Sequence, residues 1–211
     1  MTSDLARLFG DIDIYLFDQL LRGRLTPGMR VLDAGCGSGR NLVHLCQAGY
    51  EVFASDANPD AIATVRALAA SLAPHLPPGN FRVERIEAMT WPDAFADVVL
   101  SNAVLHFAGG DHQFGAMVQR LWDVLKPGGM LFCRLASTIG MEHRVRPLSG
   151  RWHLLPDGTE RYLVDEALLL ALTARLGGVL LDPLKTTVVQ DQRSMTTWVV
   201  RKGSATPMLP S

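Results

Sequence analysis

A loop rich in glycine restricts the fold more than any other feature of this 211-residue sequence. The run Val-Leu-Asp-Ala-Gly-Cys-Gly-Ser-Gly-Arg-Asn at residues 31–41 combines a short apolar strand, three alternating glycines and the start of a helix. Glycine lets the backbone approach a ligand closely, and ligands of open α/β sheets bind at the carboxyl ends of the strands. The loop therefore predicts a nucleotide-like ligand beyond the first strand of a parallel sheet.

The spacing of the glycines distinguishes between two kinds of ligand. A dinucleotide-binding loop reads G-x-G-x-x-G and needs its third glycine at the position of Arg40, whereas this chain has Gly35, Gly37 and Gly39. Asp56 ends the second predicted strand about 20 residues after the first glycine, where a carboxylate can accept hydrogen bonds from both hydroxyls of a ribose. This layout favours an adenosine without a pyrophosphate.

Strand-length apolar runs alternate with amphipathic, helix-length segments, as in βαβ units that build a parallel sheet. The predicted strands are residues 30–33, 51–56, 81–86, 96–101 and 129–135. Helices are predicted at residues 41–48, 59–73 and 111–125, with Asn58 as the N-cap of the second and Pro59 at its first position.

The two ends of the chain add further elements to a single domain of residues 1–202. A leading helix is predicted at residues 3–21, within a possible lid of residues 1–24. After the fifth strand, residues 138–163 form a long loop on the substrate side, followed by a helix at residues 164–176. Residues 184–190 and 195–202 form a final antiparallel pair, and residues 203–211 are predicted to be a disordered tail.

Charge and cysteine content restrict the partners and the compartment. The 20 basic and 21 acidic residues nearly cancel, so no global field attracts nucleic acid or an anionic membrane, and a small-molecule partner is favoured. Cys36, Cys46 and Cys133 fit neither a disulfide framework nor the spacing of a metal site. The first residues lack the basic region of a signal peptide and the apolar run of a membrane span. We expect a cytoplasmic protein without a metal, either a monomer or a homodimer.

Four motifs, taken in order, resemble the S-adenosylmethionine-dependent methyltransferases of the Rossmann-like class I, and the likeness extends from about residue 5 to residue 202. They are the glycine loop of residues 33–39, Asp56, the strand of residues 97–102 and the Lys-Pro-Gly-Gly turn within residues 125–131. The resemblance implies a doubly wound α/β fold with a seven-stranded, mostly parallel sheet and a C-terminal antiparallel pair. More weakly, Gly-Arg-Asn at residues 39–41 and Gly-Tyr-Glu-Val at residues 49–52 are similar to the tellurite-resistance-type small-molecule methyltransferases.

The resemblance also implies which residues bind S-adenosylmethionine and its product S-adenosylhomocysteine. The glycine loop would hold the methionine portion, Asp56 the ribose, and an acidic residue past the third strand would read the adenine amino group. The implied cofactor-binding residues are Asp33, Gly35, Cys36, Gly37, Asp56, Ala57, Glu87, Ala88, Met89, Asn102 and Tyr15. The family more often has Asp than Glu at the adenine position.

Catalytic and acceptor-binding residues are expected after the fourth and fifth strands. His106 has a side chain that can take a proton near neutral pH, although it would serve equally as a packing residue beside the cofactor. The long loop is basic, and its planar guanidinium groups suit a carboxylate or a phosphate of the acceptor, unless they are only solvated. The expected acceptor contacts are Arg144, Arg146, His153 and Arg161.

The reaction that the resemblance implies is in-line transfer of a methyl group to a small molecule. Alternatives are a catalytically silent subunit or sensor that binds S-adenosylmethionine, and an NAD-dependent oxidoreductase, which the misplaced third glycine and the lack of a Tyr-x-x-x-Lys pair disfavour. Ser101-Asn102-Ala103-Val104 stands where amino-directed nucleic-acid methyltransferases carry a Pro-Pro-aromatic run, so a nucleic-acid acceptor is not expected.

Overall fold

The computed structural model describes residues 3–204 of the chain. The helices are α1 (Ser3–Phe9), α2 (Ile14–Leu21), α3 (Val43–Gln47), α4 (Pro59–Leu72), α5 (Asp111–Val124) and α6 (Glu166–Arg175), with 3-10 turns η1 (Pro78–Asn80), η2 (Ile86–Ala88) and η3 (Leu105–Phe107). The strands are β1 (Arg30–Ala34), β2 (Glu51–Asp56), β3 (Phe81–Val83), β4 (Ala96–Asn102), β5 (Leu125–Ala136), β6 (Arg146–Ser149), β7 (Trp152–Leu154), β8 (Glu160–Tyr162), β9 (Gly178–Leu180), β10 (Lys185–Val189) and β11 (Arg193–Lys202). From residue 205 onward, the predicted disordered tail lies outside the described residues.

The central sheet has the strand order β10-β11-β5-β4-β1-β2-β3. Strands β1 to β5 pair in parallel, and β11 runs antiparallel to both β5 and β10. The short strand β9 also pairs with β11 and brings the sheet to eight strands. The predicted α/β fold, with a mostly parallel sheet and a C-terminal antiparallel pair, is therefore confirmed, and β9 is the addition that the sequence analysis did not include.

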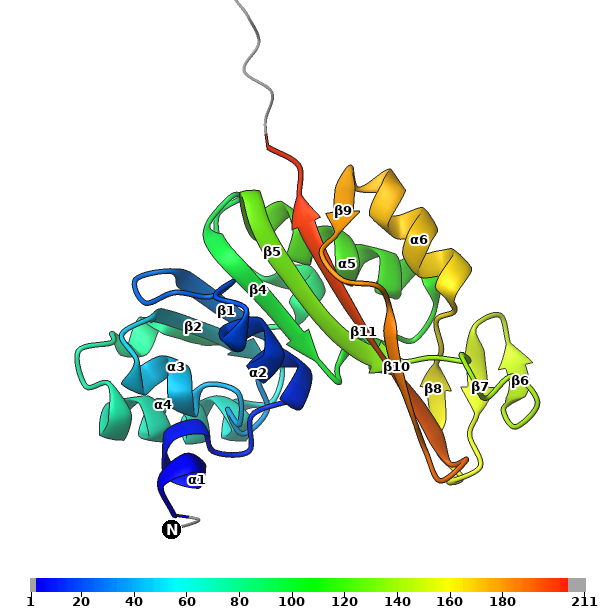
Figure 1. Cartoon of the computed structure of the whole chain (residues 1–211), viewed down its shortest axis with the longest axis horizontal. Coiled ribbons are helices and arrows are strands. Elements are labelled where there is room, and N and C mark those ends of the chain that lie inside the picture. Colours follow the sequence, from blue (N-terminus) through cyan, green and yellow to red (C-terminus); the bar gives the residue numbers. More distant parts are fainter. Residues whose placement is uncertain (1–2, 205–211) are drawn as a thin grey trace, which may run out of the picture.

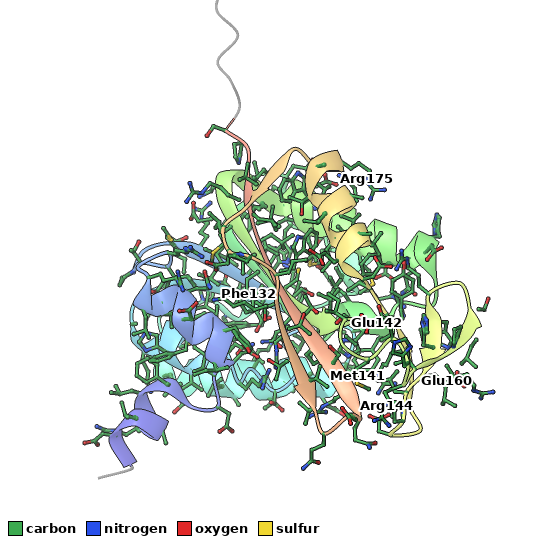
Figure 2. All side chains as sticks on the ribbon, turned by 45° about the vertical axis from the view of Figure 1, so that its right-hand side comes forward. Phe132, Met141, Glu142, Arg144, Glu160 and Arg175 are labelled. Atoms are coloured by element: carbon green, nitrogen blue, oxygen red, sulfur yellow. The ribbon has the colours of Figure 1, made fainter. Side chains whose placement is uncertain are left out.

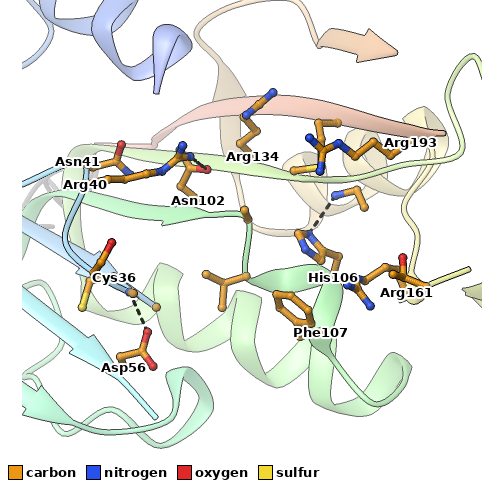
Figure 3. A pocket seen from close by; sticks show the side chains of 18 of the residues that line it. Cys36, Arg40, Asn41, Asp56, Asn102, His106, Phe107, Arg134, Arg161 and Arg193 are labelled. Carbon is orange, nitrogen blue, oxygen red and sulfur yellow. Dashed lines mark hydrogen bonds between the residues drawn. The ribbon is translucent and has the colours of Figure 1, made fainter. Parts of the chain in front are cut away.

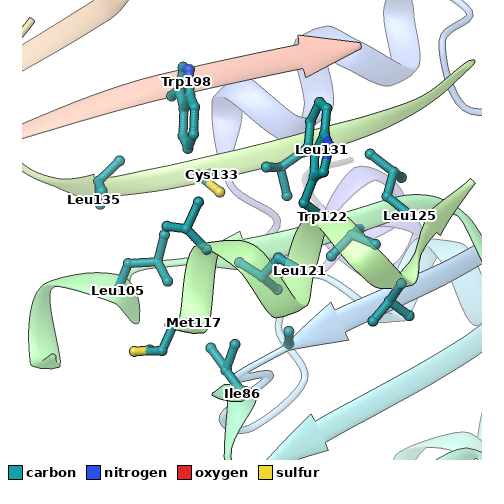
Figure 4. Close-up of a cluster of buried hydrophobic side chains, with 14 of the residues drawn as sticks. Ile86, Leu105, Met117, Leu121, Trp122, Leu125, Leu131, Cys133, Leu135 and Trp198 are labelled. Carbon is teal, nitrogen blue, oxygen red and sulfur yellow. The ribbon is translucent and has the colours of Figure 1, made fainter. Parts of the chain in front are cut away.

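Helices cover both faces of this sheet (Figure 1). On one face, Leu16 of α2 and Ile62 of α4 pack with sheet residues such as Phe132. On the other face, Leu121 and Trp198 belong to a second cluster, to which α5 and α6 contribute (Figure 4). Among residues 3–204, no helix is long and apolar enough to cross a membrane.

The leading helix predicted at residues 3–21 is two helices. Gly10 follows α1 with φ 58°, a left-handed conformation that does not continue a helix. Asp13 then starts α2 as its N-cap, because its carboxylate accepts a hydrogen bond from the backbone N–H of Tyr15. The prediction of one helix was wrong because its apolar period ran through both of these signals.

The predicted loop of residues 138–163 contains a small antiparallel sheet in the order β6-β7-β8. Trp152 pairs with Tyr162, and Arg146 pairs with Leu154. This sheet lies beside β10 and β11, past the carboxyl end of β5 (Figure 1). The third central strand is shorter than predicted, because β3 ends at Val83 and residues 86–88 form η2.

Candidate functional site

The glycine loop after β1 is tight on one side and open on the other. The φ angles of Gly35, Gly37 and Gly39 are +81°, +52° and +79°, which other residues rarely adopt. A Cβ atom on Gly35 would lie 2.5 Å from Cγ2 of Val104, whereas one on Gly37 would have no atom within 4 Å. The backbone N–H groups of Gly35 and Cys36 donate to the carbonyl of Ser55, at 2.7 and 3.1 Å. The loop is thus held against the sheet and leaves space on its outer side.

That space is a cavity of about 700 Å³ at the carboxyl ends of β1, β4 and β5. Its walls come from the glycine loop, the segment after β4, the turn between β7 and β8, and the hairpin of β10 and β11. The lining residues include Gly35, Cys36, Gly37, Arg40, Asn41, Asp56, Asn102, His106, Phe107, Arg134, Leu155, Asp157, Thr159, Arg161, Val189, Arg193 and Met195. A smaller cavity of about 160 Å³ adjoins it at Gly35, Asp56, Val104 and Phe107 and is also lined by Ala57, Glu87, Gln113 and Met117.

Asp56 lies at the junction of the two cavities. Its Oδ2 atom accepts from the N–H of Gly37 and its Oδ1 atom from the N–H of Asn58, both at 2.9 Å. A carboxylate has about four acceptor positions, so about two remain. The side chain of Asn58 caps α4, as predicted, by accepting from the N–H of Asp60. Asp56 is therefore free of the capping role and has acceptor capacity facing both cavities.

Asp33 is a buried carboxyl group directly before the glycine loop. It is only 1% exposed, and neither of its oxygens has a hydrogen-bond partner among the described residues. Burial raises the pKa of Asp33 to about 7, with a smaller upward effect from Asp56 and an opposing one from Arg40. A buried acid without a partner gains stability from a nearby cation, because only then is its charged form compensated.

The inner wall of the large cavity consists of Arg40, Asn41, Asn102 and Arg134 (Figure 3), which ion pairs and hydrogen bonds connect to Asp13. Asp13 is buried and its Oδ2 atom is 2.9 Å from Nη1 of Arg134 and 3.5 Å from Nη2 of Arg40. Arg40 also donates to Oδ1 of Asn102 at 3.1 Å, and the N–H of Asp13 donates to Oδ1 of Asn41 at 3.0 Å. The network connects the start of α2 to β4, β5 and the glycine loop, and it leaves Nδ2 of Asn102 without a partner among residues 3–204.

The predicted adenine residues differ in position. Glu87 lines the smaller cavity, and its Oε1 atom accepts from Arg85 at 2.9 Å and from Gln113 at 2.8 Å. Burial opposes ionisation of Glu87, yet hydrogen bonds from its own backbone, Arg85 and Gln113 hold its pKa below the ordinary value. Ala88 is exposed and Met89 is buried, with its sulfur accepting from the hydroxyl of Ser55. Neither residue lines a cavity described above.

Tyr15 also stands apart from the lining residues. Its hydroxyl group is 2.6 Å from Oγ1 of Thr187 on β10, and the guanidinium of Arg134 lies 5.6 Å from the centre of its ring. Leu16 beside it is fully buried, so this part of α2 is anchored to the sheet. A cofactor contact through Tyr15 and a lid role for residues 1–24 stay predictions.

His106 is buried in η3, with 7% of its surface exposed. Its Nδ1 atom lies 3.3 Å from the backbone N–H of Ala136, which can only donate. The ring proton of the neutral form therefore sits on Nε2. Burial, helped by the charge of Arg161, lowers the pKa of His106 to about 4. His106 is thus arranged as a neutral donor at this wall, and a proton acceptor of such low basicity suits the packing interpretation better than the general-base one.

Burial also decides the state of Cys36. It raises the pKa of the thiol well above its ordinary value, and the negative charges of Asp33 and Asp56 act in the same direction. Cys36 lines the large cavity as a protonated thiol.

Of the four predicted acceptor contacts, the structure places one in the cavity wall. Arg161 lines it, with its guanidinium 4.8 Å from the centre of the Phe107 ring. Arg144 is exposed and pairs with Asp191 at 3.3 Å near the tip of the β10–β11 hairpin (Figure 2). Arg146 is exposed on β6, and Nδ1 of His153 is 2.9 Å from the carbonyl of Arg151. These last three side chains do not line the large cavity.

Three cavity arginines, Arg40, Arg134 and Arg193, and one buried acid were not among the predicted site residues. Arg134 interrupts the apolar strand β5, and a charge inside a buried strand is a usable signal because it needs a partner. Asp13 was not predicted, because its partner Arg134 lies 121 residues further along the chain. Arg193 had no signal in the sequence, since only the pairing of β10 with β11 brings it to the cavity.

Comparison with known proteins identifies one family and several relatives. A family described as methyltransferase domain matches residues 32–133. The ubiquinone biosynthesis O-methyltransferase of Chelativorans sp. (strain BNC1) is 27% identical over 171 residues, which cover 74% of this chain and 64% of that protein. The malonyl-[acyl-carrier protein] O-methyltransferase of Erwinia billingiae is 32% identical over 143 residues, which cover 67% of this chain and 51% of that protein. The chain therefore spans about half to two thirds of the length of these relatives.

Solved structures share the fold. The 1,6-didemethyltoxoflavin-N1-methyltransferase of Burkholderia thailandensis, crystallised with bound 1,6-didemethyltoxoflavin and S-adenosylhomocysteine, matches with a TM-score of 0.68 and 18% sequence identity. The match covers 96% of this chain and 83% of that chain. At this identity the likeness establishes the architecture, which is the Rossmann-like fold of class I.

Proposed function

Because residues 32–133 match the methyltransferase domain family, we propose that the chain binds S-adenosylmethionine and transfers its methyl group to a small molecule. The observation that carries the proposal is the position of Asp56, at the junction of two cavities and bonded to the glycine loop. One carboxylate there serves a ribose whose adenine and methionine portions extend in opposite directions.

The residues around that junction fit the two portions. The smaller cavity offers Glu87 to the adenine amino group, and Ala57 lines the same wall. The large cavity offers the open side of Gly37 and the free amide of Asn102 to the methionine portion. Asp33 lines neither cavity, and as a buried acid without a partner it would receive a cationic ammonium group through water once it ionises. Met89 and Tyr15 act in this proposal through the packing behind the site, and the exposed Ala88 has no role in it.

In the proposed reaction, the main role of the protein is to align the acceptor nucleophile, the methyl carbon and the leaving sulfur. A nucleophilic atom of the acceptor bonds to the methyl carbon while the bond from that carbon to sulfur breaks, and the sulfur keeps the electron pair as a neutral thioether. If the nucleophile carries a proton, that proton leaves to solvent. The protein contributes by holding the two reactants in line, which lowers the entropic part of the barrier. His106 donates a hydrogen bond from Nε2 and does not take the proton.

The malonyl-[acyl-carrier protein] and ubiquinone-pathway relatives are named as O-methyltransferases. We extend from them only the broader class, a small-molecule acceptor. The balanced charge of the chain supports action without nucleic acid or an anionic membrane, and we further propose a cytoplasmic protein that is a monomer or a homodimer.

The test supplies S-adenosylmethionine with a ¹³C-labelled methyl group and the small-molecule fraction of a cell extract to the purified chain. We expect S-adenosylhomocysteine and one labelled product in equal amounts, and much less of both from Asp56→Ala at low S-adenosylmethionine concentration. Binding of S-adenosylmethionine without turnover in any fraction would instead identify a binding subunit or sensor. Absence of binding would overturn the proposal.

A further inference from the structure

The large cavity has a second end, away from the glycine loop. Figure 3 shows Arg161 and Arg193 there, near His106, whereas Cys36 and Asp56 lie at the opposite end. The wall at this second end comes from the β7–β8 turn and the β10–β11 hairpin, and Leu155, Asp157, Thr159, Val189 and Met195 contribute to it. None of these elements contains the glycine loop or Asp56, so the second end is built separately from the nucleotide end.

The arginines of the two ends differ in their partners. At the inner wall, Arg40 and Arg134 share the carboxylate of Asp13. Within residues 3–204, neither Arg161 nor Arg193 has a carboxylate within 4 Å. The guanidinium of Arg161 is held over Phe107 and by the carbonyl of Glu160, and no ion pair among the described residues involves it. Two cations that face one cavity without such a partner leave room for an anionic ligand.

The carboxylate of Asp157 at this end of the cavity limits how much negative charge a ligand there can carry. Asp157 lines the same wall, but its Oδ1 atom already accepts from the N–H and the hydroxyl group of Thr159, at 2.9 and 2.6 Å. These bonds, and then the charges of Arg161 and Arg193, hold the pKa of Asp157 below its ordinary value, so it stays ionised. Two positive groups and one negative group leave a net charge of about +1, which matches one carboxylate better than a phosphate dianion.

We propose that Arg161 and Arg193 bind a carboxylate of the methyl acceptor, so that the substrate is a small organic acid methylated at another of its atoms. This inference rests on the proposed function. The carboxylate is an anchor and not the methylated group, because it binds at the end of the cavity opposite to the glycine loop. Nε2–H of His106 and the ring of Phe107 lie between the two ends and contact the body of the acceptor.

Three variants separate an anchor from a merely basic surface. Arg161→Gln and Arg193→Gln remove one donor fork each, and hydrogen bonds to charged groups of about 1.5 to 3 kcal/mol predict a rise of roughly 10- to 100-fold in the KM of the acceptor. Arg161→Lys keeps the charge but loses the planar fork, so its KM for the acceptor should lie between those of the parent and Arg161→Gln. Arg146→Gln is the matched control, since Arg146 is exposed on the same small sheet but does not line the cavity.

The experiment divides the small-molecule fraction of a cell extract by anion exchange at pH 7 and supplies each part with ¹³C-methyl S-adenosylmethionine. We expect label only in the retained part, in a product that resists phosphatase and mild alkaline hydrolysis and is still retained as an acid. The glutamine variants should lose this turnover at low acceptor concentration and bind S-adenosylmethionine as the parent does, and Arg146→Gln should behave as the parent.

Several results would overturn the inference while leaving the proposed function intact. They are label in the neutral part, a product hydrolysed by alkali as a methyl ester, an acceptor destroyed by phosphatase, and unchanged kinetics in both glutamine variants. If no fraction is methylated, equilibrium dialysis of the S-adenosylhomocysteine-saturated protein against the retained part replaces turnover. Retention of a carboxylic acid by the parent and not by Arg193→Gln supports the anchor, and retention of none overturns it.

Discussion

Burial has opposite consequences for two residues of the site. It keeps Asp33 protonated up to a pKa of about 7, above the ordinary 3.8, so the stability that this group contributes is present below pH 3.8 and is lost as the pH rises through 7. It lowers the pKa of His106 from 6.5 to about 4, so the stability that His106 contributes is present above pH 6.5 and is lost as the pH falls through 4. Both side chains are therefore uncharged in the free protein at pH 6.

Asp33 should couple cofactor binding to pH. A bound ammonium group favours the ionised carboxylate, so the affinity for S-adenosylmethionine should rise from pH 6 to pH 7.5, with release of a proton from Asp33. Titration calorimetry in two buffers of different ionisation enthalpy measures that release. Asp33→Asn keeps the shape without the titration and should remove the pH dependence. Equal affinities of the parent at both pH values would show that the cation binds elsewhere.

His106 should act as a donor and not as a base. His106→Gln preserves an acceptor for the N–H of Ala136 and a donor toward the cavity, so we expect kcat within about tenfold of the parent, whereas loss of a general base costs about 100- to 10,000-fold. The measurement is kcat against pH for both proteins, with His106→Ala as the variant that loses both bonds. A parent profile with a pKa near 6.5 that disappears in His106→Gln would contradict this role.

At the scale of elements, local patterns predicted what nearby residues determine. The strand and glycine loop of residues 31–41 are contiguous in the chain and lead into α3 at Val43, and Asn58 caps α4 by accepting from the N–H of Asp60. The strands β6, β7 and β8 were missed because they are only three or four residues long and lack a buried alternating face. They exist only through pairing with one another. Arg193 was missed for the same reason, because only strand pairing brings it to the cavity. Arg144 and Arg146 were assigned to the site from their charge alone.

Two substitutions in the glycine loop should affect the free energy of unfolding and the affinity for S-adenosylmethionine differently. Gly35→Ala places a methyl group 2.5 Å from Val104 and should lower the free energy of unfolding by several kcal/mol, because both packing and the positive φ are violated. Gly37→Ala has free space and should cost only about 1 to 2 kcal/mol of backbone strain while weakening S-adenosylmethionine binding through the cavity.

Urea unfolding and calorimetry on both glycine variants check this difference. Gly23→Ala, at a positive φ with no atom within 4 Å and away from the cavity, is the matched control for strain without loss of affinity. Equal losses of affinity in Gly37→Ala and Gly23→Ala would mean that the open side of the loop does not face the cofactor.

For the whole molecule, one sheet serves two tasks. The parallel half, β1 to β5, gathers the proposed nucleotide-binding residues at its carboxyl edge, and these were proposed from ordered motifs in the sequence. The antiparallel half brings the β10–β11 hairpin and, beside it, the β6–β8 sheet to the same cavity. The proposed acceptor side depends on this long-range assembly, which is why only Arg161 among the predicted acceptor contacts lines the cavity.

The central claim is that the cavity at Asp56 binds S-adenosylmethionine. Titration calorimetry on the parent chain, with S-adenosylmethionine, S-adenosylhomocysteine and NAD in turn, tests it most directly. We predict dissociation constants in the micromolar range, about 8 kcal/mol, for the first two and none for NAD, and a loss of about 2 kcal/mol or more in Asp56→Ala. Binding of NAD as tight as that of S-adenosylmethionine, or an Asp56→Ala variant that binds like the parent, would contradict the account.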